Sequence, residues 1–357
     1  MIVGHGGNIV EVARQVGCRP SEISDMSSNV NPLGPPPGLL AHLAQHLEAI
    51  LALPEVDSRQ MVEAFARRHD LPADAVLAGN GTTQLIYALP RALDTRRALI
   101  LGPTYADYAD ACRMQGVAPA FSMARETDGF RPDLERLDQA AAAADTVFVC
   151  NPNNPSGALI PSADLERCCR RHPGVTFIID ESYLPFASPP AARSLMGCGL
   201  PNVVVLNSMS KIFRIPGLRI GFAVSSPATI DRLRQFALPW SVNSLAQAAV
   251  GYLMAHPAET EAFVNATRQF LDAEKAAFGE ALKAAAQLEP FPSATSFILI
   301  RLDCGLKAAA VWRRLAARRI LIRDCSNFEG LSERFIRISL KDQATNRALC
   351  RHLRELG

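Results

Sequence analysis

Lys211 lies in the stretch of the sequence that is best suited to chemistry. The apolar run at 203–206 leads into small hydroxyl residues and this lysine, and Arg219 opens a second apolar run eight residues later. The pattern predicts two buried strands joined by a loop through Pro216, with Lys211 and Arg219 at the mouth of a sheet. Partial desolvation and a nearby cation both lower the pKa of a lysine. Such an amine can form a Schiff base, although a solvated loop lysine would give the same short pattern.

Helix and strand patterns alternate over most of the chain. We expect helices at 39–52, 58–69, 82–93, 104–116, 132–143, 162–172, 227–237 and 243–256, and buried strands at 97–102, 117–122, 145–150, 175–180, 202–207 and 219–224. Strands separated by helix-length segments imply crossover connections and a largely parallel sheet with helices on both faces. Ligands of such α/β sheets bind at the carboxyl ends of the strands. The pattern therefore places a site at the strand tips.

Two further strand tips carry polar side chains. The strand at 145–150 leads into a proline-rich turn that contains Asn154, and the strand at 175–180 ends at Asp180, with Tyr183 three residues later. A buried carboxylate requires a cationic partner, and either a protonated ring nitrogen or a structural arginine would supply one. Asn154 and Tyr183 can donate hydrogen bonds to a ring oxygen, or they can be a turn residue and a surface tyrosine.

A phosphate group could bind at residues 79–83, which read Gly-Asn-Gly-Thr-Thr. This segment opens the helix expected at 82–93, where free N–H groups and the helix dipole favour an anion, although glycine before threonine is also routine N-capping. Ser208 and Arg219 could reach the same phosphate. Tyr105, just after a strand, could stack on a flat heterocycle or belong to the core.

Together these tips offer a phosphate cup, a stacking ring, a carboxylate, two donors and an amine, which are the contacts that pyridoxal phosphate requires. The motifs Asn-Pro-Ser-Gly, Asp-x-x-Tyr, Ser-x-Ser-Lys and Gly-x-Arg-x-Gly follow in this order at 154–157, 180–183, 208–211 and 217–221. This order resembles that of the fold-type I pyridoxal-phosphate enzymes of the aspartate aminotransferase superfamily, over essentially the whole chain. The resemblance implies an α/β fold with a mostly parallel, helix-covered sheet in a large domain, and a small α+β C-terminal domain.

Within that superfamily the chain is similar to the branch that holds histidinol-phosphate aminotransferases and L-threonine-O-3-phosphate decarboxylases. The segments at 5–9, 29–34, 78–81, 239–243 and 320–323 favour the decarboxylases, and His-Gly-Gly-Asn, the start of the first segment, is the sharpest of these signals. The resemblance implies a carboxy-lyase of cobalamin biosynthesis that converts L-threonine O-3-phosphate to (R)-1-amino-2-propanol phosphate. The alternative is a histidinol-phosphate-type aminotransferase.

The resemblance also assigns roles to single residues. The catalytic residues would be Lys211, which carries the cofactor as a Schiff base, Asp180, which pairs with the ring nitrogen, and Tyr183, which binds the ring oxygen. Further cofactor contacts would come from Gly81, Thr82, Tyr105, Asn154, Ser208, Ser210 and Arg219. The substrate would be held by His5, Asn29, Asn154, Arg323 and Arg337, and no metal is implied.

Two positions depart from the pattern of the relatives. Thr82 stands where an acidic residue is usual, and Leu53 stands where relatives carry a tyrosine that reaches the cofactor phosphate across a dimer interface. One phosphate hydroxyl is therefore missing, or Thr82 or Thr83 replaces it. The lost hydrogen bond should be modest beside the remaining contacts.

The length of 357 residues favours about two domains. Residues 1–38 are rich in Gly, Asn and Pro, and we expect an N-terminal arm that packs near the active site and the small domain. Residues 39–257 would form the large cofactor-binding domain. Residues 258–357 would form the small domain, with a long helix to about residue 288, strands at 295–302, 320–323 and 334–340, and helices at 306–318 and 343–355.

The composition is that of an ordinary soluble enzyme. The formal net charge is only +2, so nothing points to nucleic acid or to an anionic membrane. The nine cysteines form no C-x-x-C pair and indicate reduced thiols in a cytoplasmic protein, not disulfides or a zinc site. No apolar segment is long enough to span a bilayer, and the N-terminus lacks a signal-peptide pattern. The resemblance implies a homodimer with a shared active site.

Overall fold

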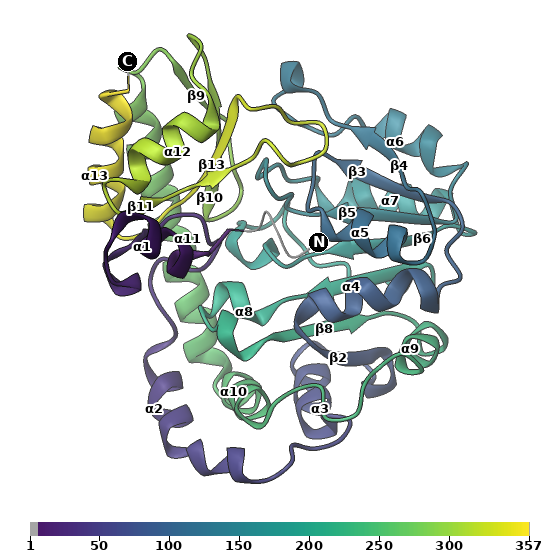
Figure 1. Ribbon diagram of the computed structural model, residues 1–357. Coiled ribbons are helices and arrows are strands. Elements are labelled where there is room, and N and C mark those ends of the chain that lie inside the picture. Colours follow the sequence, from purple (N-terminus) through teal and green to yellow (C-terminus); the bar gives the residue numbers. More distant parts are fainter. Residues whose placement is uncertain (1–5, 357) are drawn as a thin grey trace.

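The computed structural model describes residues 6–356, and within them seven strands form a central sheet (Figure 1). The strand order is β2 (Val76–Asn80), β8 (Ile220–Val224), β7 (Val203–Asn207), β6 (Thr176–Asp180), β5 (Thr146–Cys150), β3 (Ala98–Gly102) and β4 (Ala120–Met123). The strands from β7 to β4 are parallel to their neighbours, whereas β8 is antiparallel to both β7 and β2. The predicted α/β fold with a mostly parallel sheet is confirmed.

The inner strands of this sheet are buried because helices cover it. All residues of β3, β5 and β8 are buried, as expected for strands with both faces covered. The helices of this part are α3 (Arg59–Arg68), α4 (Gly81–Ala92), α5 (Asp107–Met114), α6 (Leu134–Ala141), α7 (Ser162–Arg171), α8 (Met209–Ile212), α9 (Pro227–Arg234) and α10 (Ser244–Ala255). Strand β2 was not predicted, because its short apolar run leads directly into the glycine-containing segment at 79–83, which was assigned to a phosphate site.

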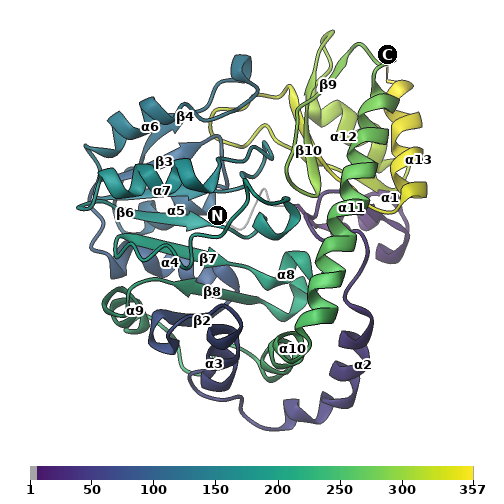
Figure 2. The same ribbon diagram turned by 180° about the vertical axis from the view of Figure 1, so that it is seen from behind.

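The C-terminal part forms a second, antiparallel sheet. Its order is β12 (Arg323–Asp324), β13 (Phe335–Ser339), β10 (Phe297–Leu302) and β9 (Leu288–Pro290). The long helix α11 (Pro257–Leu282) runs from α10 to this sheet, where it lies beside α13 (Gln343–Arg354), as Figure 2 shows. Helix α12 (Ala308–Ala316) completes this part. The domain boundaries at 38 and 257 stay a prediction.

The N-terminal segment joins the two sheets. Helix α1 (Ile9–Val16) lies beside α12 and β11 (Ile320–Leu321) (Figure 1). Its buried Val12 and Ala13 belong to one apolar cluster with Ala316 and Leu321. Strand β1 (Ser24–Asp25) then pairs in parallel with β11. The chain continues past α8 to α2 (Pro37–Gln45) on the outside of the molecule. Residues far apart in the sequence thus meet around the carboxyl ends of the large sheet.

Two further features of the described residues concern the cysteines and the helices. Its nine cysteines are free thiols, six of them buried. Within residues 6–356, none of the helices combines the length and the apolar character that crossing a membrane requires.

Candidate active site

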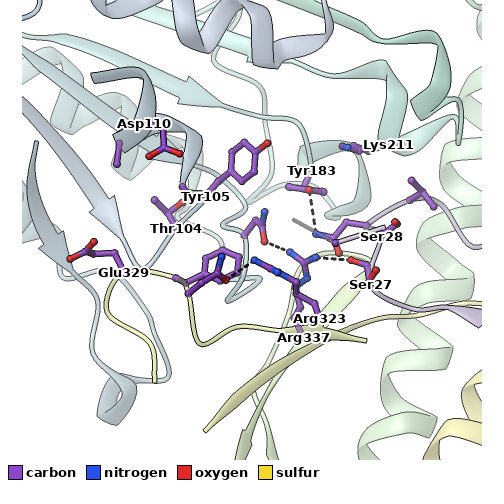
Figure 3. Close-up of a pocket in the computed structure, with 18 of the residues that line it drawn as sticks. Ser27, Ser28, Thr104, Tyr105, Asp110, Tyr183, Lys211, Arg323, Glu329 and Arg337 are labelled. Carbon is purple, nitrogen blue, oxygen red and sulfur yellow. Dashed lines mark hydrogen bonds between the residues drawn. The ribbon is translucent and has the colours of Figure 1, made fainter. Parts of the chain in front are cut away.

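A cavity of about 540 Å³ opens between the carboxyl ends of the parallel strands and the second sheet (Figure 3). A smaller inner cavity continues from it towards the start of α4. The two share four lining residues, namely Tyr105, Asn154, Tyr183 and Lys211. They therefore form one site with an inner and an outer compartment.

Lys211 lies where the two compartments meet. It is the third residue of α8, the single helical turn that follows β7. Burial lowers the pKa of its amine to about 8, and the Arg219 guanidinium adds to this shift, while the carboxylate of Asp180 partly opposes it. These are the two effects that the sequence pattern predicts for a reactive amine.

Asp180 lines the inner compartment at the end of β6. It is buried, and its carboxylate accepts hydrogen bonds from the Tyr108 hydroxyl at 2.7 Å and from the Ser182 backbone N–H at 2.9 Å. Sequence reasoning missed Tyr108, because a tyrosine on the apolar face of a helix has the pattern of a core residue. Its position three residues after Tyr105, within the helix expected at 104–116, was the available signal.

The start of α4 and Arg219 form the other end of the inner compartment. Gly81 has a φ of +72°, and a Cβ there would lie 2.7 Å from the Arg219 guanidinium. Only glycine therefore allows this arginine to approach the helix N-terminus. Thr82, Thr83 and the buried Ser208 line the same end. Backbone N–H groups, hydroxyls and a guanidinium meet here, which is the donor set that a phosphate requires.

Of three further positions that the sequence singled out, two do not line the cavity and one cannot be placed. The Ser210 hydroxyl donates to the Ile220 carbonyl and accepts from the Ile220 N–H, both at 3.2 Å, so it faces β8 and does not line the cavity. Leu53 is 75% exposed on the surface of the chain. His5 falls outside the described residues.

Arg337 is a buried cation at the inner wall of the outer compartment. Its guanidinium donates to the amide oxygen of Asn154 and, at 2.7 Å, to the Ser27 carbonyl (Figure 3). It also lies 5.1 Å from the Phe297 ring centroid. Its Nε is buried and has no partner within residues 6–356. Burial also lowers the pKa of this arginine. A buried cation without a paired carboxylate favours an anionic ligand.

Arg323 lies beside Arg337, because the two residues face each other across β12 and β13. Arg323 donates to Asn327 at 2.7 Å and stacks over the Phe328 ring at 5.2 Å, so it lies nearer the mouth of the cavity. The outer compartment thus contains two adjacent arginines. Together they can bind two anionic groups of one molecule.

Asn29 connects the two compartments. Its amide nitrogen donates to the Tyr183 hydroxyl at 3.3 Å (Figure 3). Its oxygen accepts from the Ser339 hydroxyl at 2.6 Å. Burial raises the pKa of Tyr183 to about 12, so its hydroxyl stays a neutral hydrogen-bond donor. The largely buried Tyr105 packs edge-to-face on Tyr108 at 5.7 Å and lines both cavities.

The inner compartment fits pyridoxal phosphate. Its two ends carry opposite chemistry, with a carboxylate at Asp180 and a cluster of phosphate donors at α4, and a low-pKa amine stands at the entrance. The Ser182 hydroxyl lines it, is buried and has no partner within the described residues. The structure thus brings together the predicted residues Gly81, Thr82, Tyr105, Asn154, Asp180, Tyr183, Ser208, Lys211 and Arg219.

Comparison with known proteins supports this interpretation of the site. Residues 21–353 match the family model described as aminotransferase class I and II. The chain is similar to a threonine-phosphate decarboxylase of Salmonella typhimurium, with 35% identity over 99% of this chain and 96% of that protein. It is 31% identical to a histidinol-phosphate aminotransferase of Symbiobacterium thermophilum, over 96% of this chain and 92% of that protein.

A solved structure extends the comparison to the fold. The L-threonine-O-3-phosphate decarboxylase of Porphyromonas gingivalis superposes with a TM-score of 0.82 and 33% sequence identity, over 93% of this chain and 98% of that one. The similarity therefore extends over nearly the whole chain.

Proposed function

Because the chain belongs to the aminotransferase class I and II family, we propose that it is a pyridoxal-phosphate-dependent decarboxylase of L-threonine O-3-phosphate. The product would be (R)-1-amino-2-propanol phosphate, an intermediate of cobalamin biosynthesis. The observation that carries the proposal is the pair of adjacent arginines, Arg323 and Arg337, in the cavity that contains Lys211. L-Threonine phosphate presents two anionic groups to such a pair, its carboxylate and its phosphate.

The inner compartment would hold the cofactor through the residues that line it. When bound, pyridoxal phosphate supplies an electron-accepting ring for the bond-breaking step. The Asp180 carboxylate would keep the ring nitrogen protonated, since a buried anion stabilises a neighbouring cation. Tyr183 would donate to the ring oxygen. The amide oxygen of Asn154 accepts a hydrogen bond from Arg337, so the amide nitrogen of Asn154 would be the second donor to the ring oxygen.

The outer compartment would orient the substrate. Arg337 contacts Asn154 and so lies nearer the reacting carbon, whereas Arg323 lies nearer the mouth. We infer that Arg337 binds the carboxylate and Arg323 the phosphate. Binding of the phosphate by Arg323 would provide the energy that holds the carboxylate in its less hydrated, reactive orientation.

Lys211 would hold and deliver the proton that replaces the carboxylate on the α-carbon. Its pKa of about 8 allows its Nζ to hold or release a proton near neutral pH. In the balanced reaction the bond between the α-carbon and the carboxylate breaks, CO₂ leaves, and one proton is added to the same carbon. The same lysine would instead move the α-proton in an aminotransferase. The cofactor contacts therefore suit both reactions, and an assay must distinguish decarboxylation from amino-group transfer.

Incubation of the holoenzyme with L-threonine O-3-phosphate, without a keto acid, should release one CO₂ for each aminopropanol phosphate formed. L-Threonine without its phosphate should react with kcat/KM lower by about 10²-fold or more, because it loses charge-assisted hydrogen bonds worth about 3 kcal/mol. Absence of CO₂, with transfer of the amino group to 2-oxoglutarate, would establish the aminotransferase instead.

We also propose that the active form is a homodimer in the cytoplasm. Large apolar side chains are exposed along α2, the turn that follows it and the loop that precedes α10, namely Leu40, Leu47, Ile50, Leu51, Leu53, Val56, Leu238 and Trp240. The loop before α10 is joined to the segment after α2 by a hydrogen bond from the Trp240 N–H to the Val56 carbonyl at 3.0 Å. Apolar surface of this extent favours a protein partner. Sedimentation equilibrium should give twice the mass of one chain, and a monomer at micromolar concentration would contradict the proposal.

A further inference from the structure

The helix that carries Lys211 is too short to hold its own position. Helix α8 has four residues, from Met209 to Ile212. A single turn fixes several backbone dihedral angles for very few hydrogen bonds, so it is not stable alone. The last carbonyls of a helix also have no partner within it. The place of Lys211 is therefore set by contacts that α8 makes with other segments.

Besides the packing of its buried Met209 and Ile212, α8 has hydrogen bonds to two other segments of the chain. On one side the Ser210 hydroxyl bonds to both backbone groups of Ile220 in β8. At the C-terminal end the contact comes from Asn31, which is fully buried. The Asn31 backbone N–H donates to the Lys211 carbonyl at 3.0 Å, and its side-chain nitrogen donates to the Ile212 carbonyl at 2.8 Å.

The Asn31 side chain is itself fixed. Its amide nitrogen also donates to the Thr267 hydroxyl on α11 at 2.8 Å, and its oxygen accepts from the Leu33 N–H at 2.9 Å. Both polar atoms of the amide are thus satisfied without any ligand. The side chain links the end of α8 to α11 and to the N-terminal segment in one rigid arrangement.

Asn31 belongs to a segment that also touches the other half of the site. We call residues 26–31 the strap. Its Ser27 carbonyl accepts from Arg337, and its Asn29 donates to Tyr183. The Met26 carbonyl accepts from the Ser339 N–H of β13 at 2.8 Å. The strap therefore joins the lysine helix to the strand that carries the inner arginine.

We propose that Asn31 is a positioning residue for Lys211, which it holds at the junction of the two compartments by fixing the end of α8. The inference rests on the catalytic role of Lys211 in the proposed function. Without the Asn31 amide, the buried Ile212 carbonyl loses its donor, and the end of α8 keeps only the backbone bond from residue 31 to the Lys211 carbonyl, so the turn can shift. A displacement of about 1 Å in a reacting group lowers rates by about 10²-fold.

A matched control separates positioning from simple stability. Asn202 is also a buried asparagine, and its amide nitrogen donates to the carbonyls of Cys169, His172 and Val175 at 3.0 Å each. It lies at the opposite end of the strands, away from both cavities. Asn31→Ala and Asn202→Ala should therefore lower the melting temperature by similar amounts, while only the first should disturb Lys211.

The first readout uses the cofactor-free protein. Carbamylation of Lys211 by cyanate, followed across pH by peptide mass spectrometry, reports the pKa of its amine. In the wild type and in Asn202→Ala the midpoint should lie near 8. In Asn31→Ala it should move upward towards the ordinary lysine value, because the amine gains access to water and moves away from Arg219. Asn31→Ser, which is too short to reach both partners, should shift it in the same direction if the alanine variant does not fold.

The second readout uses the holoenzyme and L-threonine phosphate. Asn31→Ala should lower kcat by about 10-fold to 10²-fold and leave KM within about threefold, because Arg323 and Arg337 are not in contact with Asn31. An unchanged titration and kcat would show that Asn31 is merely structural and would overturn the proposal. A higher KM with normal kcat would also overturn it. If the wild type released no CO₂, the proposed function would fall, and the carbamylation titration would still decide the role of Asn31.

Discussion

Replacing Lys211 by alanine is expected to lower the decarboxylation rate by about 10⁴-fold, the upper end of what a positioned acid–base group contributes. The variant loses the amine at the junction of the two compartments, which is the group that would carry both the cofactor and the proton. The inner compartment keeps its carboxylate and its phosphate donors. The variant should therefore still bind pyridoxal phosphate, but without a covalent bond.

Two measurements test this prediction. Reduction of the holoenzyme with borohydride should attach the cofactor to Lys211 in the wild type and leave the variant unlabelled. Lys275→Met serves as the control, since Lys275 is also largely buried and donates to the Ser293 carbonyl at 3.2 Å, but lies outside both cavities. It should keep activity within about twofold, as expected for a substitution away from the site. Full turnover in the alanine variant would refute the proposed chemistry.

The sequence predicts the site residues that directly follow the ends of strands. The carboxyl ends of β5, β6 and β7 lie at one edge of the sheet, so Asn154, Asp180 and Lys211 had to meet there once the strands were recognised. Arg219 reaches the same edge for a different reason. Strand β8 is antiparallel to β7, so its beginning and not its end lies beside Lys211.

The direction of a side chain on a short element was not predictable. Ser208 and Ser210 read alike in the sequence, as small hydroxyl residues before a lysine. In the structure Ser208 precedes the single turn of α8 and lines the cavity, whereas Ser210 lies within the turn and faces β8. The face that each residue presents depends on where the turn begins, and local composition does not fix that point.

Contacts between segments that are distant in the sequence were also not predictable from it. The N-terminal arm was expected near the site, yet nothing in the pattern around Asn31 indicates that it meets α8, whose carbonyl at Ile212 is 181 residues away. Tyr108 likewise reads as a core residue until β6 brings Asp180 to its hydroxyl. Local patterns predict elements and their ends. Which buried polar groups satisfy one another is decided by tertiary packing.

Replacing Arg337 by methionine is expected to lower kcat/KM for L-threonine phosphate by about 10² to 10³-fold. Methionine keeps the apolar contact with Phe297 and removes the charge, so the substrate's anion loses a buried, charge-assisted partner worth about 3–4 kcal/mol. The effect should appear mainly in KM, since the contact exists before the reaction begins. Arg334→Met is the matched control on the same segment. Arg334 is half exposed and pairs with Asp303 at 2.7 Å, so its loss should change kcat/KM by less than about twofold.

Product inhibition then tests which anionic group Arg337 binds. Aminopropanol phosphate keeps the phosphate of the substrate but has no carboxylate. If Arg337 binds the carboxylate, Arg337→Met should leave the inhibition constant of the product within about threefold of the wild type, whereas Arg323→Met should raise it by about 10-fold or more. The opposite result would exchange the roles of the two arginines. Equal effects of Arg337→Met and Arg334→Met on kcat/KM would remove Arg337 from the substrate site, because its buried charge would then serve only the Asn154 and Ser27 contacts that the structure already shows.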